Sequence, residues 1–220
     1  MAAAALVALA AVVAIGYLAG ALPFGLWLGW ALKGVDVRTL GSGNLGATNV
    51  YRALGPGPGV ATLLLDLLKG ALPVALVPGA GFAVAFPGGA EWCRVCVGLA
   101  AILGHLFTLF AGFRGGKGVA TTAGVLLALS PIAFIASLVL FLAPVAATRF
   151  ISVGSILGAI ACAITLGVTR QWRGPVPWFG LVVAALVIVR HGENLRRLAR
   201  GEERRFSLRR PADPPAGARP

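Results

Sequence analysis

Apolar residues dominate this chain in long windows that contain no charged side chain. Five such windows cover residues 2–32, 95–113, 118–148, 150–169 and 174–189. A bilayer core of about 30 Å needs about 20 apolar helical residues, so most of these windows are long enough to span it. The mean hydropathy of +0.90 and a charged fraction of 12% lie outside the range of a water-soluble domain. The pattern predicts an all-α polytopic membrane protein.

The window at 118–148 would form a single helix of about 46 Å, which exceeds the bilayer core. Ser130-Pro131 lies inside it, and the residue before a proline avoids helical backbone angles, so we expect a turn there. The chain then has about seven transmembrane helices, although residues 118–130 are few for a complete span. The expected ranges are 4–28, 58–77, 91–111, 118–130, 132–147, 151–169 and 175–190.

Basic side chains fall unevenly on the two sides of this arrangement. Together with the C-terminal tail, one side holds Lys33, Arg38, Arg52, Arg114, Lys117, Arg149 and Arg190. The other side holds Arg94, Arg170 and Arg173. Because an excess of Lys and Arg marks the cytoplasmic face, we expect the N-terminus outside and the C-terminus in the cytoplasm.

The net charge is +12, and nine of the nineteen basic residues belong to a C-terminal basic stretch made up of Arg190 and the arginines from Arg196 onward. Its position next to a span favours topology and anionic lipid headgroups over nucleic acid as the explanation. We expect one integral-membrane domain at 1–205, followed by a basic, Pro-rich, disordered tail at 206–220. The two histidines and three cysteines have no metal-ligand spacing, so we expect neither a metal nor a cofactor.

The first polar segment concentrates glycines and small polar side chains beside one arginine. Glycines allow the backbone to turn its N–H groups inward, and such a nest suits a phosphate, which an arginine can clamp with two parallel bonds. A solvated glycine-rich loop is the alternative, but the density of polar groups favours the phosphate site. The candidates are Gly41, Ser42, Gly43, Asn44, Thr48, Asn49 and Arg52.

The second polar segment is a basic, glycine-rich turn that leads into an apolar helix, whose N-terminus attracts anions. Lys117, between Gly116 and Gly118, is its candidate cation. A Walker A loop is excluded, because Gly118 stands where Ser or Thr would bind magnesium. His105 precedes this turn within an apolar stretch and, taken alone, is typical of a packing histidine.

The third polar segment follows the last span. His191 and Asn194 share a helical face there, and Glu202 follows in the segment Arg200-Gly201-Glu202. Basic residues end many last spans, so the pairing of His191 with Asn194 is the feature that argues for a site.

Two further polar positions lie at or within spans. Ser152 belongs to a group of hydroxyls and an arginine at one span entrance. Lys69 follows Asp66 by three residues inside an apolar span, where unpaired charges are costly. Lys69 therefore either forms an internal ion pair or reaches toward a bound anion.

Three sequence blocks, GSGNLGATNVYR, GHLFTLFAGFRGGKGVAT and RHGENLRRLARGE, occur in this order. They resemble the signature blocks of the acyl-phosphate:glycerol-3-phosphate acyltransferases of the PlsY type. The resemblance covers residues 23–203. Two positions depart from it: Thr108 stands where the family usually has proline, and Arg114 where it often has lysine.

The resemblance implies transfer of a fatty acyl group from acyl phosphate to the 1-hydroxyl of glycerol 3-phosphate, giving lysophosphatidic acid and phosphate. This reaction is the first acylation step of bacterial phospholipid synthesis. It implies a bacterial inner membrane protein in contact with lipids, with its active site facing the cytoplasm and no nucleic-acid partner. The sequence leaves the oligomeric state open, and a monomer is compatible with it.

Site roles follow from the same resemblance. Catalytic roles fall to Ser42, Arg52, Lys117, His191 and Asn194. Substrate or phosphate binding falls to Gly41, Gly43, Asn44, Thr48, Asn49, Lys69, His105, Gly116, Gly118, Ser152 and Glu202. The group that accepts the hydroxyl proton stays open between a substrate phosphate oxygen and a histidine.

Two other functions compete with this one. A transporter for a phosphorylated metabolite would show an internal repeat and a site at the membrane midplane. A lipid phosphotransferase would need clustered carboxylates to hold magnesium. The sequence shows no internal repeat, and its seven acidic residues form no cluster near the polar loops except Glu202-Glu203.

Overall fold

The computed structural model describes residues 2–207, and within this range the regular elements are all helices. Of the tail predicted to be disordered, residues 206–220, positions 206 and 207 are described and positions 208–220 lie outside the described range. The longer helices are α1 (Ala2–Ala21), α2 (Phe24–Lys33), α4 (Pro56–Leu76), α6 (Gly89–Leu106), α7 (Val119–Leu129), α8 (Pro131–Thr148), α9 (Ile151–Arg170) and α10 (Val176–Arg190). The short helices are α3 (Ala47–Leu54), α5 (Phe82–Ala85) and α11 (Gly192–Ala199).

Five helical stretches of the described chain are long and apolar enough to cross a membrane, and a sixth is formed if α10 and α11, bent by 54°, are counted as one span. The remaining predicted span, 118–130, corresponds to α7, which has 11 residues. At 1.5 Å per residue α7 is about 16 Å long, well short of the bilayer core. The prediction of a helical membrane protein is confirmed, whereas seven complete spans are not.

Prolines set two of the helix boundaries. Ser130 is extended, and its side chain accepts a hydrogen bond from the Ala133 N–H, so it caps α8 directly before Pro131. The predicted turn inside 118–148 is therefore present. Pro23 separates α1 from α2, a break that the expected single span at 4–28 did not include.

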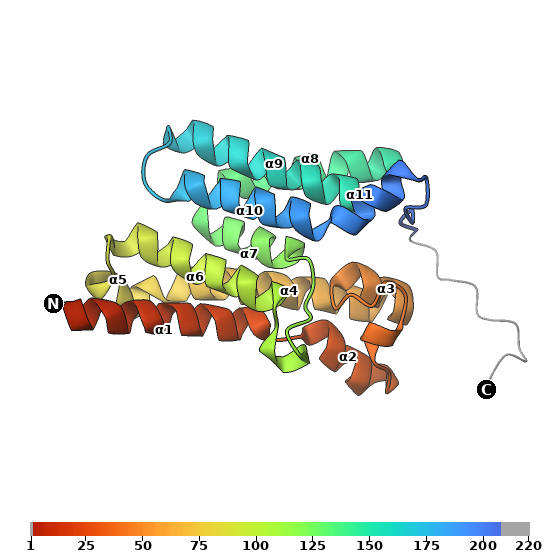
Figure 1. The fold of residues 1–220 in the computed structure, drawn as a ribbon, viewed down its shortest axis with the longest axis horizontal. Helices are drawn as coiled ribbons and strands as arrows, with labels where there is room; N and C mark the ends of the chain where they lie inside the picture. Colours follow the sequence, from red (N-terminus) through yellow and green to blue (C-terminus); the bar gives the residue numbers. More distant parts are fainter. Residues whose placement is uncertain (1, 208–220) are drawn as a thin grey trace, which may run out of the picture.

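The long helices run back and forth along the bundle, with α2 continuing the direction of α1, so α2, α3 and α11 gather at the end of the bundle opposite the N-terminus (Figure 1). The turn before α7 and the junction of α8 with α9 lie toward the same end. The three polar segments therefore share one end of the bundle, as the sequence predicted.

Glycines allow neighbouring helices to approach until their backbones touch. A Cβ on Gly20 would lie 1.9 Å from the Ala101 carbonyl oxygen, where α1 meets α6. A Cβ on Gly124 would lie 1.9 Å from the Leu67 carbonyl oxygen, where α7 meets α4. Small residues play this part in membrane bundles because lipid supplies no hydrophobic force between helices and close packing must hold them together.

We expect Gly124→Ala to lower the stability of the protein, because the added methyl group would push α7 away from α4. Overpacking of this kind costs about 1 to 3 kcal/mol. Thermal unfolding of the purified protein in detergent measures the effect. Gly57→Ala is the control, since a Cβ there meets nothing within 4 Å. Equal melting temperatures for the two variants would contradict the role of this contact.

Candidate active site

The buried side chain of Asn49 holds the first polar loop in shape. Its Nδ2 donates to the carbonyl oxygens of Val37, Leu40 and Asn44 at 3.2, 3.1 and 2.9 Å, and its Oδ1 accepts the Ser42 N–H at 2.9 Å. The Asn49 amide is thus committed to the loop backbone. Asn49 was expected to bind phosphate, but its amide instead stabilises the loop from the buried side.

The loop around this amide is tight. Gly41 has φ 59° and Gly43 has φ 67°, a left-handed conformation that favours glycine. Asn44 accepts the Gly46 N–H at 2.8 Å through its Oδ1, so this oxygen also stabilises the turn. Ser42 is exposed, and Thr48 is half-buried in the first turn of α3. Among the polar residues predicted in this loop, Ser42 and Thr48 are the ones whose side chains reach the loop surface and do not hold the loop together.

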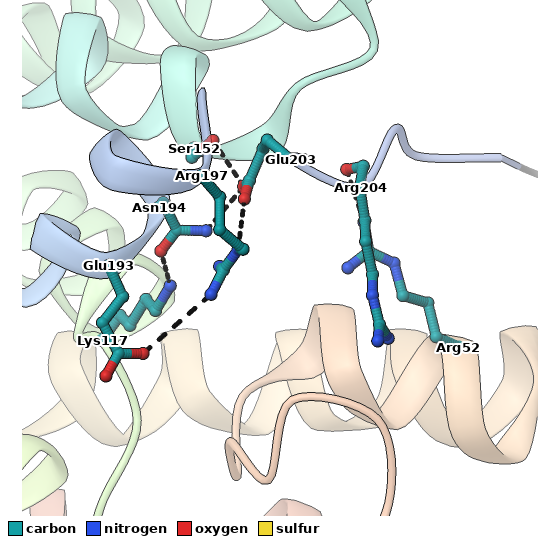
Figure 2. Close-up of polar contacts among 8 residues, drawn as sticks. All are labelled: Arg52, Lys117, Ser152, Glu193, Asn194, Arg197, Glu203 and Arg204. Carbon is teal, nitrogen blue, oxygen red and sulfur yellow. Dashed lines mark hydrogen bonds and ion pairs between the residues drawn. The ribbon is translucent and has the colours of Figure 1, made fainter. Parts of the chain in front are cut away.

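Glu203 is the centre of a hydrogen-bond network at the end of α11 (Figure 2). Its Oε1 accepts from Ser152 Oγ at 2.8 Å and from Asn194 Nδ2 at 2.6 Å, and its Oε2 accepts from Arg197 Nε at 2.8 Å. Burial alone would raise the pKa of Glu203, but the bonds from Asn194, Arg197 and Ser152 outweigh it and hold the pKa below its usual value. Glu203 is therefore a carboxylate at neutral pH.

Glu202 is the glutamate selected from the sequence as a candidate, whereas Glu203 is the glutamate that joins this network. Glu202 is exposed, while the Glu203 side chain is only 7% exposed. Gly201, with φ 71°, turns the chain after α11 and directs Glu203 back toward the helix. The adjacent glycine was a usable signal for the turn, but which of two neighbouring glutamates faces inward depends on the turn geometry.

Lys117 joins the same network through Asn194, whose Oδ1 accepts a hydrogen bond from Lys117 Nζ (Figure 2). Asn194 thus links a cation on one side to Glu203 on the other. Burial, reinforced by the nearby positive charge of Arg197, lowers the pKa of Lys117 to about 8. The Lys117 ammonium is charged at neutral pH but loses its proton more easily than a surface lysine.

Arg52, on α3, lies on the side of Glu203 opposite Lys117 and Asn194 (Figure 2). Its Nη2 donates to the carbonyl oxygen of Arg204 at 3.2 Å, and Figure 2 shows the two arginine side chains next to each other. Burial and then the charge of Arg204 lower the pKa of Arg52 from its usual value, although an arginine stays protonated. Like charges held this close favour an anion between them.

The region contains more positive than negative charge. Arg52, Lys117, Arg197 and Arg204 face Glu203, while Glu193 is 85% exposed and pairs with Arg197 at 4.0 Å. The arrangement can bind a multivalent anion such as a phosphate.

Arg190 and His191 pack beneath this cationic cluster. Arg190 Nη2 donates to the Gly116 carbonyl oxygen at 3.0 Å, which ties α10 to the Lys117 turn. His191 is 3% exposed, and its Nδ1 lies 2.8 Å from the Val187 carbonyl oxygen. A neutral His191 therefore carries its proton on Nδ1 and leaves Nε2 as an acceptor. No carboxylate within the described chain orients this ring.

Lys69 and His105 lie in a small polar pocket below the Lys117 turn. Lys69 Nζ is 2.8 Å from Asp66 Oδ1 and donates to the Leu22 carbonyl oxygen at 2.7 Å. Of the two roles considered for Lys69, the structure supports the internal ion pair; the Lys69 side chain is 3% exposed.

His105 supports the turn from inside. Its backbone carbonyl accepts the Gly116 N–H at 3.1 Å, and a Cβ on Gly116 would lie 2.1 Å from His105 Nε2. Thr108, which departs from the family pattern, donates through its hydroxyl to the Ala21 carbonyl oxygen at the end of α1. Gly118, with φ 82°, completes the turn at the start of α7. Gly116, Gly118 and His105 thus shape the Lys117 turn.

The site brings together four of the predicted residues, Arg52, Lys117, Ser152 and Asn194, and adds Glu203, Arg197 and Arg204. Within residues 2–207 no group of three or more His, Cys, Asp or Glu side chains could hold a metal ion.

Comparison with known proteins gives one consistent result. A sequence model of the family described as glycerol-3-phosphate acyltransferase matches residues 10–201. The glycerol-3-phosphate acyltransferase of Anaeromyxobacter sp. (strain Fw109-5) is 51% identical over 196 residues, covering 89% of this chain and 95% of that protein.

Two solved structures agree. The glycerol 3-phosphate form of PlsY, an integral membrane glycerol 3-phosphate acyltransferase, superposes with a TM-score of 0.82 and 40% identity, covering 90% of this chain and 96% of that one. The lysophosphatidic acid form gives a TM-score of 0.79 and 39% identity over 91% and 96% of the two chains. The chain therefore belongs to the glycerol-3-phosphate acyltransferase family of the PlsY type and is an integral membrane acyltransferase.

Proposed function

We propose that this protein transfers a fatty acyl group from acyl phosphate to the 1-hydroxyl of glycerol 3-phosphate and releases lysophosphatidic acid and phosphate. The observation that carries the proposal is the cationic cluster between α3 and α11, in which Arg52, Lys117, Arg197 and Arg204 outnumber the single buried carboxylate of Glu203. Both proposed substrates carry a phosphate. The two related PlsY structures are a glycerol 3-phosphate form and a lysophosphatidic acid form.

We infer that the cluster faces the cytoplasm of a bacterial inner membrane. Lys33 ends α2, Arg149 follows α8 and Arg190 ends α10, so basic residues accumulate at the same end as the cluster. Arg170 and Arg173 lie at the other end of α9. The asymmetry of basic residues supports this orientation.

An acyl-phosphate donor fits the chemistry of the site because it is a mixed anhydride and is already activated. The hydroxyl oxygen of glycerol 3-phosphate attacks the acyl carbon, the bond from that carbon to the phosphate oxygen breaks, and phosphate leaves. No cysteine or serine nucleophile is required. Cys93, Cys96 and Cys162 lie within α6 and α9, which is consistent with a packing role.

We assign roles from the contacts. Arg52 and Lys117 bind phosphate oxygens, and Asn194 orients the Lys117 ammonium. The loop around Ser42 donates hydrogen bonds to glycerol 3-phosphate. A substrate phosphate oxygen takes the hydroxyl proton, while His191 positions groups around it. Within residues 2–207 the His191 ring bonds to the Val187 carbonyl oxygen rather than to a carboxylate, which supports a positioning role for His191. Holding both substrates together supplies much of the rate, since proximity can lower a barrier by about 7 to 11 kcal/mol.

The donor is tested by assaying the purified protein with palmitoyl phosphate, palmitoyl-CoA and palmitoyl acyl carrier protein, each with glycerol 3-phosphate. We expect turnover with palmitoyl phosphate alone, because the site offers phosphate-binding cations and no thioester-processing nucleophile. Turnover with a thioester donor and none with acyl phosphate would overturn the proposal.

We expect Arg52→Ala and Lys117→Ala each to reduce kcat/KM by about 30- to 1000-fold, because each removes a charge-assisted bond to phosphate worth about 2 to 4 kcal/mol in the transition state. Steady-state kinetics with palmitoyl phosphate measure the loss. Arg173→Ala is the matched control, an exposed cation at the opposite end of the bundle. If all three variants behave alike, the cluster is not the phosphate site.

The pH profile should report the lowered pKa of Lys117. In the free enzyme this ammonium is charged below about pH 8 and neutral above it, so kcat/KM should fall as the pH rises through about 8. Phosphate monoesters lose their second proton near pH 6 and do not cause this fall. Lys117→Arg keeps its charge and should lack the decline between pH 7.5 and 9, which is the range to be measured. A variant profile that matches the wild type would assign the decline to another group.

A further inference from the structure

Residues 203–206, here called the C-terminal strap, follow α11 and cross from α11 to α3. They lie beyond residues 10–201, the part of the chain that the family sequence model matches. Figure 2 shows Glu203 beside α11 and, one residue later, Arg204 beside Arg52 of α3. The strap therefore connects the two halves of the cationic cluster.

The strap is anchored on both sides of the cluster. Glu203 bonds to Ser152 at the start of α9 and to Asn194 on α11. At the other end, the Phe206 N–H donates to the Arg149 carbonyl oxygen at 2.6 Å, and the Phe206 ring packs against the Tyr51 ring with centroids 5.2 Å apart and planes tilted by 52°. Both ends of the strap are thus held by specific contacts.

The contact with Tyr51 bears directly on Arg52, the next residue of α3. Arg52 has a long side chain with many rotamers, and the charge of Arg204 beside it opposes its approach. The Arg204 carbonyl oxygen offsets this repulsion by accepting one of the five N–H donors of the guanidinium. This is the one hydrogen bond that the Arg52 guanidinium makes within residues 2–207, so the bond orients the group and leaves N–H donors to bind a phosphate.

We propose that Phe206 is a positioning residue of the glycerol 3-phosphate site. Its ring on Tyr51 and its N–H on Arg149 hold the Arg204 carbonyl where it orients the Arg52 guanidinium toward the substrate phosphate. This inference rests on the proposed function, in which Arg52 binds phosphate. Phe206 acts only through Arg52, so its effect must depend on the presence of that side chain.

A purely structural tether makes different predictions. If the strap only stabilised the end of the bundle, losing Phe206 would lower the melting temperature and reduce binding in the same proportion whether or not Arg52 is present. If Phe206 positions Arg52, its loss weakens glycerol 3-phosphate binding in the wild type and has no further effect once Arg52 is replaced.

The experiment is calorimetric titration of the purified full chain in detergent with glycerol 3-phosphate. We expect Phe206→Ala to weaken glycerol 3-phosphate binding by about 3- to 10-fold, in line with the loss of one aromatic pair. Phe206→Tyr keeps the ring and should bind like the wild type. Arg205→Lys is the control on the same segment. Arg205 lies over the Phe150 ring, 5.6 Å from its centroid, rather than against α3, and the substitution keeps the charge.

The decisive comparison is made in the Arg52→Gln background, where Phe206→Ala should leave the remaining affinity within about twofold. Equal losses in both backgrounds, or unchanged binding by Phe206→Ala, would overturn the inference. If Phe206→Ala does not fold, Phe206→Leu keeps the apolar bulk and removes the ring, and wild-type binding by that variant would also overturn it. A wild-type protein that fails to bind glycerol 3-phosphate would instead reject the proposed function.

Discussion

Close contact between helix backbones is the constraint on which the rest of this structure depends. At the interfaces of α1 with α6, α4 with α7, and α8 with α9, a glycine occupies a place where a Cβ would lie within 2.5 Å of a carbonyl oxygen of the neighbouring helix. Helices in lipid gain little from burying apolar surface, so their association relies on this close packing. The positions of the polar turns at the helix ends follow from it.

The turn that carries Lys117 illustrates the connection. It lies between α6 and α7, and α7 is held to α4 by Gly70 and Gly124. Below the turn, Asp66 and Lys69 form an ion pair, which lowers the free-energy cost of placing these two charges inside α4. A helix as short as α7 has little independent stability, so its neighbours determine where Lys117 lies.

Charge organises the site above this framework. Several cations lie around one carboxylate, and an anionic ligand would relieve the repulsion among them. Glu203 accepts hydrogen bonds from Arg197 and Asn194 and so fixes both side chains. Asn194 in turn accepts a hydrogen bond from Lys117 and orients its ammonium. Because these like charges lie close together, the arrangement costs stability when no anion is present.

The sequence by itself determined the membrane class, the break at Pro131 and the polar segments that gather at one end of the bundle, because apolar windows, prolines and glycine-rich basic motifs act locally. Tertiary structure alone decided that Glu203 rather than Glu202 faces the cluster, that Asn49 holds a loop, and that Lys69 pairs with Asp66. It also decided that α7 is too short to span and that residue 206 belongs to the packed structure. These outcomes depend on how the chain turns after Gly201 and on contacts between residues far apart in sequence, and no local pattern encodes either.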